Sequence, residues 1–210
     1  MIENKKYFIK TQGCQMNVYD SDKISDLLVH HYNMTRTEDP DNADILILNT
    51  CSIREKAEKT VRKRLEFFES IKEKNSKMKV CVMGCMAERL KRKFLEEEKI
   101  VDLVVGPDAY KDIPRLLQEV ENENEAVNVL LSKDETYGDI SPVRLNSNGI
   151  SAFVSITRGC DNMCTFCVVP FTRGRERSRD PKSILNEIED LRYKGYKEIT
   201  LLGLNVDSYL

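Results

Sequence analysis

Short apolar runs alternate with apolar stripes at helical spacing between residues 5 and 121 of the chain. Such runs are typical of strands buried on both faces of a sheet, and such stripes are typical of the helices that cover it. Strands are predicted at Lys6–Thr11, Ala43–Leu48, Met78–Met83 and Asp102–Gly106. Helices are predicted after a cap at Asp20 or Ser21, after a capping box at Ser52–Glu55, over Ala87–Glu97 and over Pro107–Val120. The alternation predicts an α/β fold with an N-terminal parallel sheet flanked by helices.

Periodicity is weak between residue 126 and Gly149, where turn signals occur at 132–134 and 146–149. We therefore predict a linker in this stretch, with an N-terminal domain at residues 1–145 and a second domain at residues 146–210. The second domain begins with a predicted strand at Ala152–Thr157. A helix capped by Asp180 and a strand at Lys197–Leu202 follow, which make one β/α unit and the first strand of another.

The composition is that of an ordinary globular protein, with 40% hydrophobic and 32% charged residues among 210. A formal net charge of -2 means that any nucleic-acid contact would be local. No apolar run reaches the roughly 20 residues that cross a bilayer, and the N-terminus does not resemble a signal peptide, so we expect a cytoplasmic protein without membrane contact. In that compartment the seven cysteines are metal ligands or free thiols rather than disulfides. The two histidines, His30 and His31, are neighbours on different faces of a helix, and we expect them to be surface or packing residues.

The pattern C-x3-C-x2-C occurs once, at Cys160, Cys164 and Cys167. Three thiols at this spacing on one loop face a common point in space. They suit a soft metal ion or an iron–sulfur cluster, so this loop is the first candidate for chemistry.

A second set of cysteines follows the predicted strands of the N-terminal domain. Cys14, Cys51 and Cys85 each come one to three residues after a strand. Because the carboxyl ends of parallel strands line one edge of a sheet, these thiols are expected to converge there as ligands rather than to be three separate core residues. Cys81 lies inside the third strand and is expected to pack in the core.

An arginine-rich stretch follows the C-x3-C-x2-C loop, with four arginines against one glutamate at residues 172–179. The arginines are Arg173, Arg175, Arg177 and Arg179. They could contact phosphates of a nucleic acid, or they could pair with acids and backbone groups near the loop; the sequence favours neither.

Several short motifs, spread over nearly the whole chain, resemble those of a known enzyme family. They are residues 11–17 (TQGCQMN), 49–57 (NTCSIREKA), 84–85 (GC), 157–167 and the arginine-rich 168–179 (VVPFTRGRERSR). With them the chain resembles the methylthiotransferase family of radical S-adenosylmethionine (SAM) enzymes, and more narrowly the members that modify tRNA.

The resemblance implies two [4Fe–4S] clusters. Cys160, Cys164 and Cys167 would hold one, leaving an iron open to bind SAM and pass an electron to it. Phe166 would pack beside the adenine of SAM, or else shield the cluster from water. Cys14, Cys51 and Cys85 would hold an auxiliary cluster, also with an open iron, that carries or supplies the inserted sulfur.

The implied reaction is insertion of a methylthio group at C2 of N6-isopentenyladenosine, next to the anticodon of a tRNA. The implied partners are the tRNA anticodon loop and a one-electron donor such as a flavodoxin or ferredoxin, and a monomer is expected. The reacting base lies in a single-stranded loop, so reaching it needs no opening of a duplex.

Two departures from the family accompany this resemblance. Leu204 stands where the family usually has glutamine. The family has a (β/α)6 barrel followed by a small RNA-binding domain, whereas this chain contains the first β/α unit of an incomplete barrel, so we expect the 210 residues alone to be inactive.

Two other functions stay open. One is a sister methylthiotransferase that acts on a ribosomal protein or on threonylcarbamoyladenosine in tRNA. The other is a non-catalytic metal-binding module with two zinc sites, although tetrahedral zinc wants four ligands and each cysteine set offers three.

Overall fold

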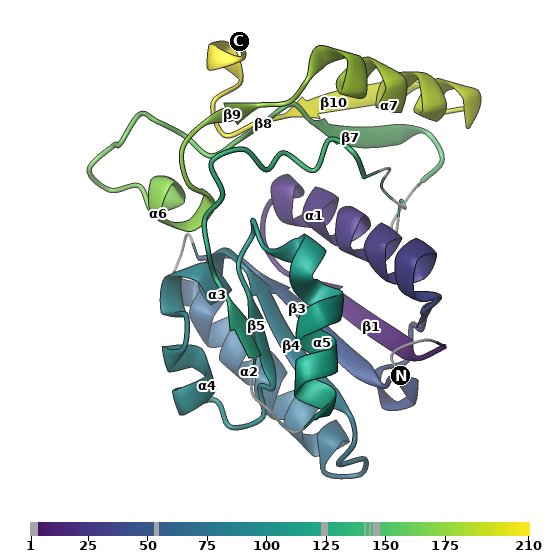
Figure 1. The fold of residues 1–210 in the computed structure, drawn as a ribbon, viewed down its shortest axis with the longest axis vertical. Helices are drawn as coiled ribbons and strands as arrows, with labels where there is room; N and C mark the ends of the chain where they lie inside the picture. The colour runs from purple at the N-terminus through teal and green to yellow at the C-terminus, as the bar shows by residue number, and fades with distance from the viewer. Residues whose placement is uncertain (1–3, 53–54, 123–125, 141, 143, 145–147) are drawn as a thin grey trace.

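The computed structural model describes residues 4–52, 55–122, 126–140, 142, 144 and 148–210. Its first part is a parallel sheet of six strands in the order β2-β1-β3-β4-β5-β6 (Figure 1). The strands are β1 (Lys6–Thr11), β2 (Thr35–Arg36), β3 (Ile45–Thr50), β4 (Lys79–Gly84), β5 (Leu103–Val105) and β6 (Ala126–Asn128). This confirms the predicted α/β class.

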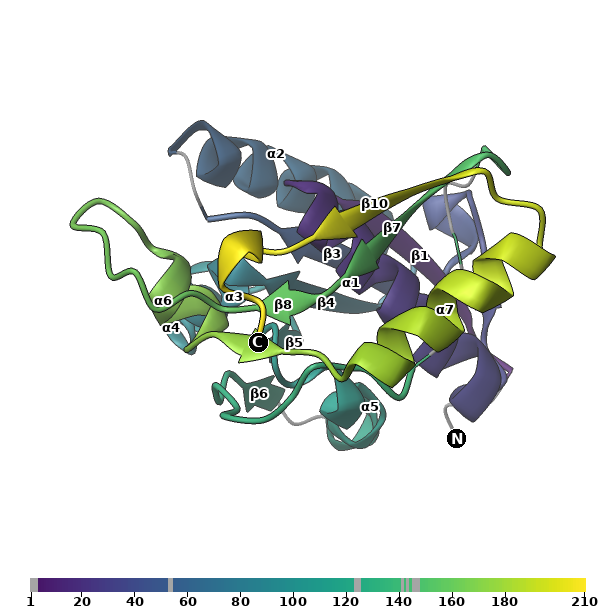
Figure 2. The same ribbon diagram turned by 90° about the horizontal axis from the view of Figure 1, so that it is seen from above.

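Helices cover both faces of the sheet and give the first part three layers (Figures 1 and 2). They are α1 (Gln15–Asp26), which continues as the π-helical turn η1 (Leu27–His31), α2 (Glu55–Lys72), α3 (Cys85–Leu90), α4 (Lys93–Glu97) and α5 (Ile113–Glu121), with the short 3-10 turns η2 (Pro40–Asn42) and η3 (Tyr110–Asp112). Residues of α1 and α5 such as Ile24 and Leu116 form one core with the sheet. Residues of α2 and α4 such as Phe68 and Phe94 form a second core on the other face.

The four predicted strands are confirmed, but the sheet is wider at both edges. β2 pairs with β1 and β6 pairs with β5, each in parallel register. The strand at Ala126–Asn128 lies at the start of the stretch in which a linker was predicted, and it was not itself predicted. Both extra strands are two or three residues long, which is too short for an apolar pattern to be visible in the sequence.

Three helix boundaries also differ from the prediction. The helix predicted over Pro107–Val120 begins only at Ile113, after the 3-10 turn η3. The first helix begins at Gln15 with Cys14 as its N-cap, not at Asp20 or Ser21, because Asp20 is buried and pairs with arginines instead of capping. The helix predicted over Ala87–Glu97 is broken after Leu90, where Lys91 has φ of 53°. The predicted capping box at Ser52–Glu55 lies outside the described residues, since residues 53 and 54 and the side chain of Glu55 are not among them.

The second part of the structure begins a barrel. Its elements are β7 (Ser151–Ser155), β8 (Thr157–Arg158), α6 (Val169–Arg173), β9 (Arg177–Ser178), α7 (Pro181–Tyr193), β10 (Glu198–Leu202) and the 3-10 turn η4 (Val206–Ser208). β7 and β10 are parallel neighbours with α7 between them in the chain, and Asp180 caps α7 by accepting a hydrogen bond from the Ser183 amide at 2.9 Å. The predicted β/α unit followed by one further strand is confirmed.

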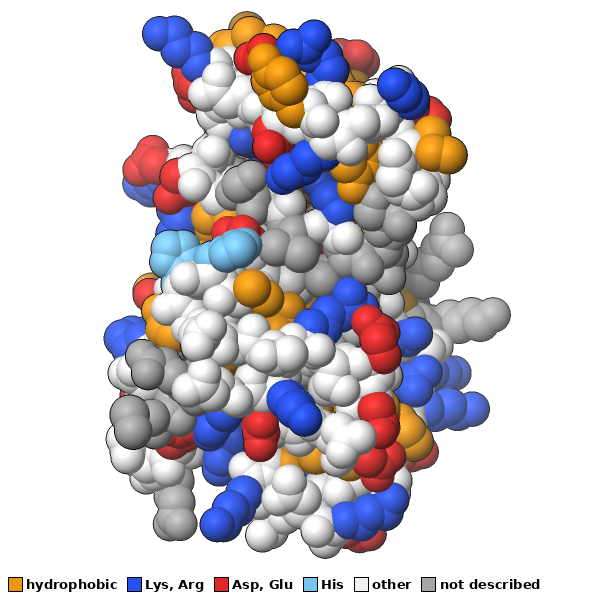
Figure 3. All heavy atoms as spheres, turned by 90° about the vertical axis from the view of Figure 1, so that its right-hand side faces the viewer, with side chains coloured by type: hydrophobic (Ala, Val, Ile, Leu, Met, Phe, Trp, Pro, Cys, Tyr) orange, Lys and Arg blue, Asp and Glu red, His pale blue; other side chains and the backbone are white. Residues whose placement is uncertain are grey.

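The surface position predicted for the histidines is confirmed. Both histidines are exposed, and Figure 3 shows histidine side chains on the face that carries interspersed basic and acidic groups. Among the described residues, no helix is both long enough and apolar enough to cross a bilayer.

Candidate functional site

Three cysteines lie at the carboxyl edge of the central strands, as predicted. Cys14 follows β1 and caps α1, Cys51 follows β3 directly, and Cys85 follows β4 as the first residue of α3. We call these three the strand-end triad. Cys51 and Cys85 are buried and Cys14 is half-buried. Cys81, in contrast, is buried in the core beneath the sheet, where burial raises the pKa of its thiol far above the usual value, so its predicted core role is confirmed.

Two glycines let these strand ends approach closely. A Cβ on Gly13 would lie 2.7 Å from Asn17 Oδ1 and 2.9 Å from the Cβ of Cys51. A Cβ on Gly84 would lie 2.5 Å from Asn49 Oδ1 and 2.6 Å from the carbonyl oxygen of Thr50. Both glycines also have positive φ, at 141° and 92°. The residue before Cys14 and the residue before Cys85 must therefore be glycine for the triad to assemble.

A buried pair of asparagines holds the strand ends together. Asn17 Nδ2 donates to Asn49 Oδ1 at 3.1 Å and to the Thr50 carbonyl at 3.0 Å. Asn49 Nδ2 donates to the Asn17 carbonyl and to Ser21 Oγ, both at 2.9 Å. Asn17 and Asn49 stand within the motifs at residues 11–17 and 49–57, and the sequence alone predicts no role for them. Their only signal in the sequence was that each stands within three residues of a strand-end cysteine.

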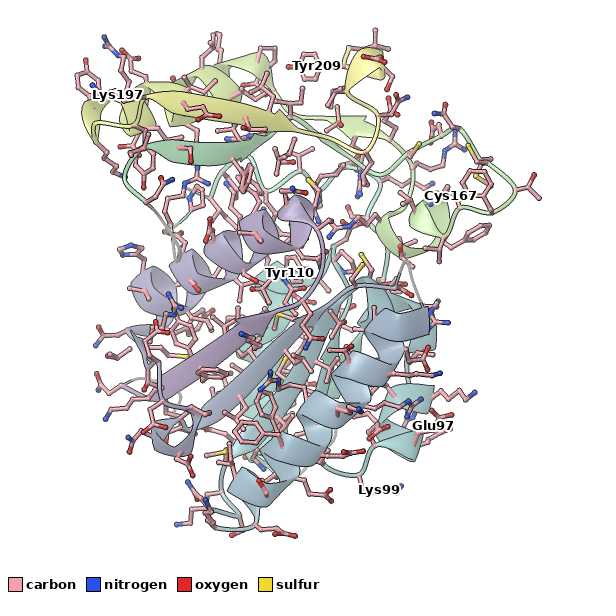
Figure 4. All side chains as sticks on the ribbon, turned by 180° about the vertical axis from the view of Figure 1, so that it is seen from behind. Glu97, Lys99, Tyr110, Cys167, Lys197 and Tyr209 are labelled. Atoms are coloured by element: carbon pink, nitrogen blue, oxygen red, sulfur yellow. The ribbon has the colours of Figure 1, made fainter. Side chains whose placement is uncertain are left out.

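The other set of cysteines lies on the loop between β8 and α6. Cys160 is buried, Cys164 is exposed and Cys167 is half-buried, and the Cys167 amide donates to the Cys164 carbonyl at 2.9 Å. We call these three the loop triad; Figure 4 shows its labelled member Cys167 beside α6, away from the sheet. Phe166 is 93% exposed, so its ring stands open on the same loop.

Arg173 joins the two triads. It is the last residue of α6, six positions after Cys167, and its Nε donates to the Sγ of Cys85 at 3.1 Å. Burial raises the pKa of Cys85, and the charge and hydrogen bond of Arg173 oppose that rise. The arginine thus favours the thiolate form that a metal ligand needs.

Asp20 anchors this arrangement from α1. Asp20 Oδ1 lies 2.7 Å from Arg158 Nη1, and Asp20 Oδ2 lies 2.8 Å from Arg173 Nη2. The Tyr110 hydroxyl donates a hydrogen bond to Oδ2 at 3.3 Å. Burial by itself would raise the pKa of Asp20, but the charges of Arg158 and Arg173 outweigh burial and hold that pKa below its usual value. Two carboxylates of the first part with buried side chains, Asp20 and Asp108, therefore face the buried guanidinium groups of the second part.

The arginine-rich stretch is mostly structural. Arg173, Arg177 and Arg179 are buried, with Arg177 paired to Asp108 and Arg179 paired to Glu187. Arg175 differs, because its side chain is 77% exposed and pairs with Asp161 at 2.6 Å on the loop of the loop triad. Of the two alternatives left open by the sequence, internal pairing holds for the three buried arginines.

The strand-end triad offers a metal group three thiols and, next to Cys85, one guanidinium group. No three histidine, cysteine or carboxylate side chains in the described part of the chain are arranged to hold one metal ion. A four-iron cluster spaces its thiolate ligands more widely than an ion does, and it carries negative charge. Arg173, whose Nε donates to Cys85, has a buried Nη1 without a hydrogen-bond partner among the described residues, which leaves a donor for such a group.

Glu88 is a buried carboxylate one helical turn after Cys85. Neither of its oxygens has a hydrogen-bond partner in the described structure, and the nearest cation is Lys91 Nζ at 3.8 Å. Burial raises the pKa of Glu88 to about 7, and the neighbouring Asp108 adds to the rise. Since the folded pKa lies above the ordinary value, the folded state loses stability as pH rises from the ordinary carboxylate pKa through about 7.

Glu88→Gln is therefore expected to stabilise the protein at high pH. At about pH 8 the free energy of unfolding should exceed that of the parent by about 1–3 kcal/mol, and the gain should vanish toward about pH 5. Denaturant unfolding at the two pH values measures this. Glu96→Gln, an exposed change on α4, is the control and should shift neither value. A gain that does not depend on pH would contradict the assignment.

Comparison with known proteins agrees with this division into two parts. Residues 6–106 match the model of "Uncharacterized protein family UPF0004", and residues 154–210 match that of the radical SAM superfamily. Curated proteins named tRNA-2-methylthio-N(6)-dimethylallyladenosine synthase are similar to almost the whole chain. The one from Christiangramia forsetii is 68% identical over 206 residues, which is 98% of this chain and 43% of the relative. Those from Flavobacterium psychrophilum and Bacteroides fragilis are 69% and 56% identical, and the chain covers 43% and 45% of their lengths.

The sheet with its strand-end triad and the barrel start with its loop triad are thus the UPF0004 and radical SAM parts of one chain. The chain belongs to the radical SAM methylthiotransferase family. It spans somewhat less than half the length of the curated relatives it matches.

Proposed function

We propose that this chain takes part in the synthesis of 2-methylthio-N6-dimethylallyladenosine in tRNA, with the loop triad and the strand-end triad each holding a [4Fe–4S] cluster. The observation that carries the proposal is the meeting of three strand-end cysteines with a buried arginine donor delivered by the cysteine loop of the radical SAM part. The names of relatives that are 68% and 69% identical supply the reaction and the tRNA substrate.

The residues of this chain would divide the work between the two triads. Cys160, Cys164 and Cys167 would hold a cluster whose open iron binds SAM and supplies one electron to it. The exposed Phe166 ring stands beside these ligands, where it can cover the adenine of SAM. Arg175 holds Asp161 and so fixes the loop that carries the three thiols.

The strand-end triad would hold the auxiliary cluster that carries or supplies the sulfur. Gly13 and Gly84 give its ligands their close approach, and Arg173 donates a hydrogen bond to the sulfur of Cys85. The described barrel sheet contains only β7 and β10, and two strands cannot enclose a nucleotide. We therefore assign turnover to a protein of the relatives' full length and expect the 210-residue polypeptide to hold clusters without turnover.

The proposed function also implies a cellular location, partners and an oligomeric state. A protein that modifies tRNA would act in the cytoplasm, with the anticodon loop as its partner, and we propose that it works as a monomer. Reduction of the loop-triad cluster needs a one-electron donor, for which a flavodoxin or a ferredoxin is suitable.

Metal analysis after anaerobic reconstitution tests the two clusters. The polypeptide should bind about eight irons with an equal amount of sulfide. Changing all members of either triad to alanine should remove about half of both. Cys81→Ala is the control, because Cys81 lies in the core and belongs to neither triad, and it should keep the full iron content. Bound zinc without sulfide would instead identify a non-catalytic metal-binding module.

The tRNA substrate is tested with the full-length gene. Nucleosides of tRNA from a deletion strain should lack 2-methylthio-N6-dimethylallyladenosine and accumulate the precursor without the methylthio group. An unchanged level of that nucleoside would point to a sister activity, on a ribosomal protein or on threonylcarbamoyladenosine.

A further inference from the structure

Arg173 is placed to act on the strand-end triad, although it belongs to the other part of the chain. Its Nε donates to Cys85 Sγ at 3.1 Å, and its side chain is buried. It ends α6, the helix that directly follows the loop triad. A residue that only tied the two parts together would need the ion pair with Asp20 but not the hydrogen bond to sulfur.

The guanidinium group is placed by an ion pair in addition to its hydrogen bond to Cys85. Asp20 Oδ2 lies 2.8 Å from its Nη2, and Asp20 is itself fixed by Arg158 at 2.7 Å. The Arg173 carbonyl accepts a hydrogen bond from Arg177 Nη2 at 2.7 Å, so the backbone at this point is also fixed. Arg173 therefore presents a constant positive charge and a constant donor to the Cys85 sulfur.

We propose that Arg173 is a positioning residue that raises the reduction potential of the strand-end cluster from within the radical SAM part. The inference rests on the proposed function, because it assumes that the strand-end triad holds an iron–sulfur cluster. Reduction adds negative charge to the cluster, and a donor and a positive charge at a ligand sulfur stabilise the reduced form more than the oxidised form. In a buried site this interaction is weakly screened.

The test uses a background in which the loop triad is changed to alanine, so that only the strand-end cluster forms. Arg173→Met is compared with the parent and with Arg175→Met, a matched loss of an arginine whose exposed side chain contacts Asp161 and no cysteine in the described structure. Iron and sulfide are counted first. The midpoint potential is then measured by titration followed with electron paramagnetic resonance.

We expect all three proteins to bind about four irons, with the midpoint of Arg173→Met shifted to a more negative potential and that of Arg175→Met unchanged. Equal midpoints in the parent and Arg173→Met would overturn the inference and leave the proposed cluster intact. A parent without iron and sulfide would overturn the proposed function itself, and the inference with it.

A second variant covers the case in which the methionine protein does not fold. Arg173→Lys keeps a positive charge for Asp20 but has a methylene group where arginine has Nε. We expect a folded protein with a negative shift smaller than that of the methionine variant. A lysine variant with the parent's midpoint would show that the hydrogen bond to Cys85 does not set the potential.

Discussion

Asp20→Asn is expected to lower the free energy of unfolding by about 3–5 kcal/mol, because it removes a buried negative charge that pairs with two buried guanidinium groups. Arg158 and Arg173 are both almost inaccessible to solvent, and Asp20 is the carboxylate that both contact within 3 Å. Asparagine fills the same volume, so little of the loss comes from packing. Denaturant unfolding followed by circular dichroism measures it.

The expected loss also depends on pH. The pKa of Asp20 is held below its usual value, so its contribution is fully present above the unfolded carboxylate pKa and is lost as pH falls through the lower folded pKa. The difference in stability between the parent and Asp20→Asn should therefore begin to shrink below about pH 4 and should vanish only below the lowered folded pKa of Asp20. Asp161→Asn is the control, because it breaks an exposed Asp–Arg pair and should cost less than about 1 kcal/mol. Equal losses for the two variants would show that the buried cluster of charges is not what stabilises the contact between the two parts.

The sequence predicted most of the frame on which the site is built. The central strands were visible because they are buried on both faces, and a run such as Ile45–Leu48 has no solvent side to interrupt it. The three strand-end cysteines could be grouped for the same reason, since parallel strands bring their carboxyl ends to one edge. The start of the first helix was misplaced because Asp20 has the chemistry of an N-cap, and only the fold shows that two arginines occupy it.

The roles of the arginines could not be predicted, because each depends on a partner far away in the chain. Arg158 and Asp20 are separated by 138 residues, and Arg173 and Cys85 by 88. A run of arginines on a local stretch looks the same whether it faces phosphate or a buried carboxylate. The exposed Arg175, between buried neighbours at 173 and 177, shows that the alternation follows the packing of the second part against α1 and α3.

This packing surrounds the strand-end triad with residues from both parts of the chain. Cys14, Cys51 and Cys85 come from the sheet, but the donor to Cys85 comes from α6 of the barrel part. A UPF0004 part without its radical SAM part would lack that donor, so the electrostatics of the first site depend on the second. On the sheet side of the triad, the space beside Gly84 is too small for a Cβ.

Gly84→Ala is expected to lower the free energy of unfolding by about 3–5 kcal/mol, combining backbone strain with a steric clash that the core cannot absorb. Gly84 has φ of 92° and ψ of -159°, a conformation that residues with a Cβ rarely adopt. The new methyl group would also lie 2.5 Å from Asn49 Oδ1 and 2.6 Å from the Thr50 carbonyl oxygen. Both neighbours belong to the buried network between strand ends, so relief of the clash must displace Cys51 or Cys85.

Gly195→Ala separates strain from steric clash. Gly195 has φ of 91°, almost the same as Gly84, but a Cβ there would meet nothing within 4 Å. This variant should cost only about 1 kcal/mol and should keep the full iron and sulfide content of the parent. Gly84→Ala, prepared and reconstituted in the same way, should lose about half of both, since its effect falls on the strand-end triad. If the two alanine variants were equally stable and bound equal iron, the close approach at Gly84 would have no part in assembling the site.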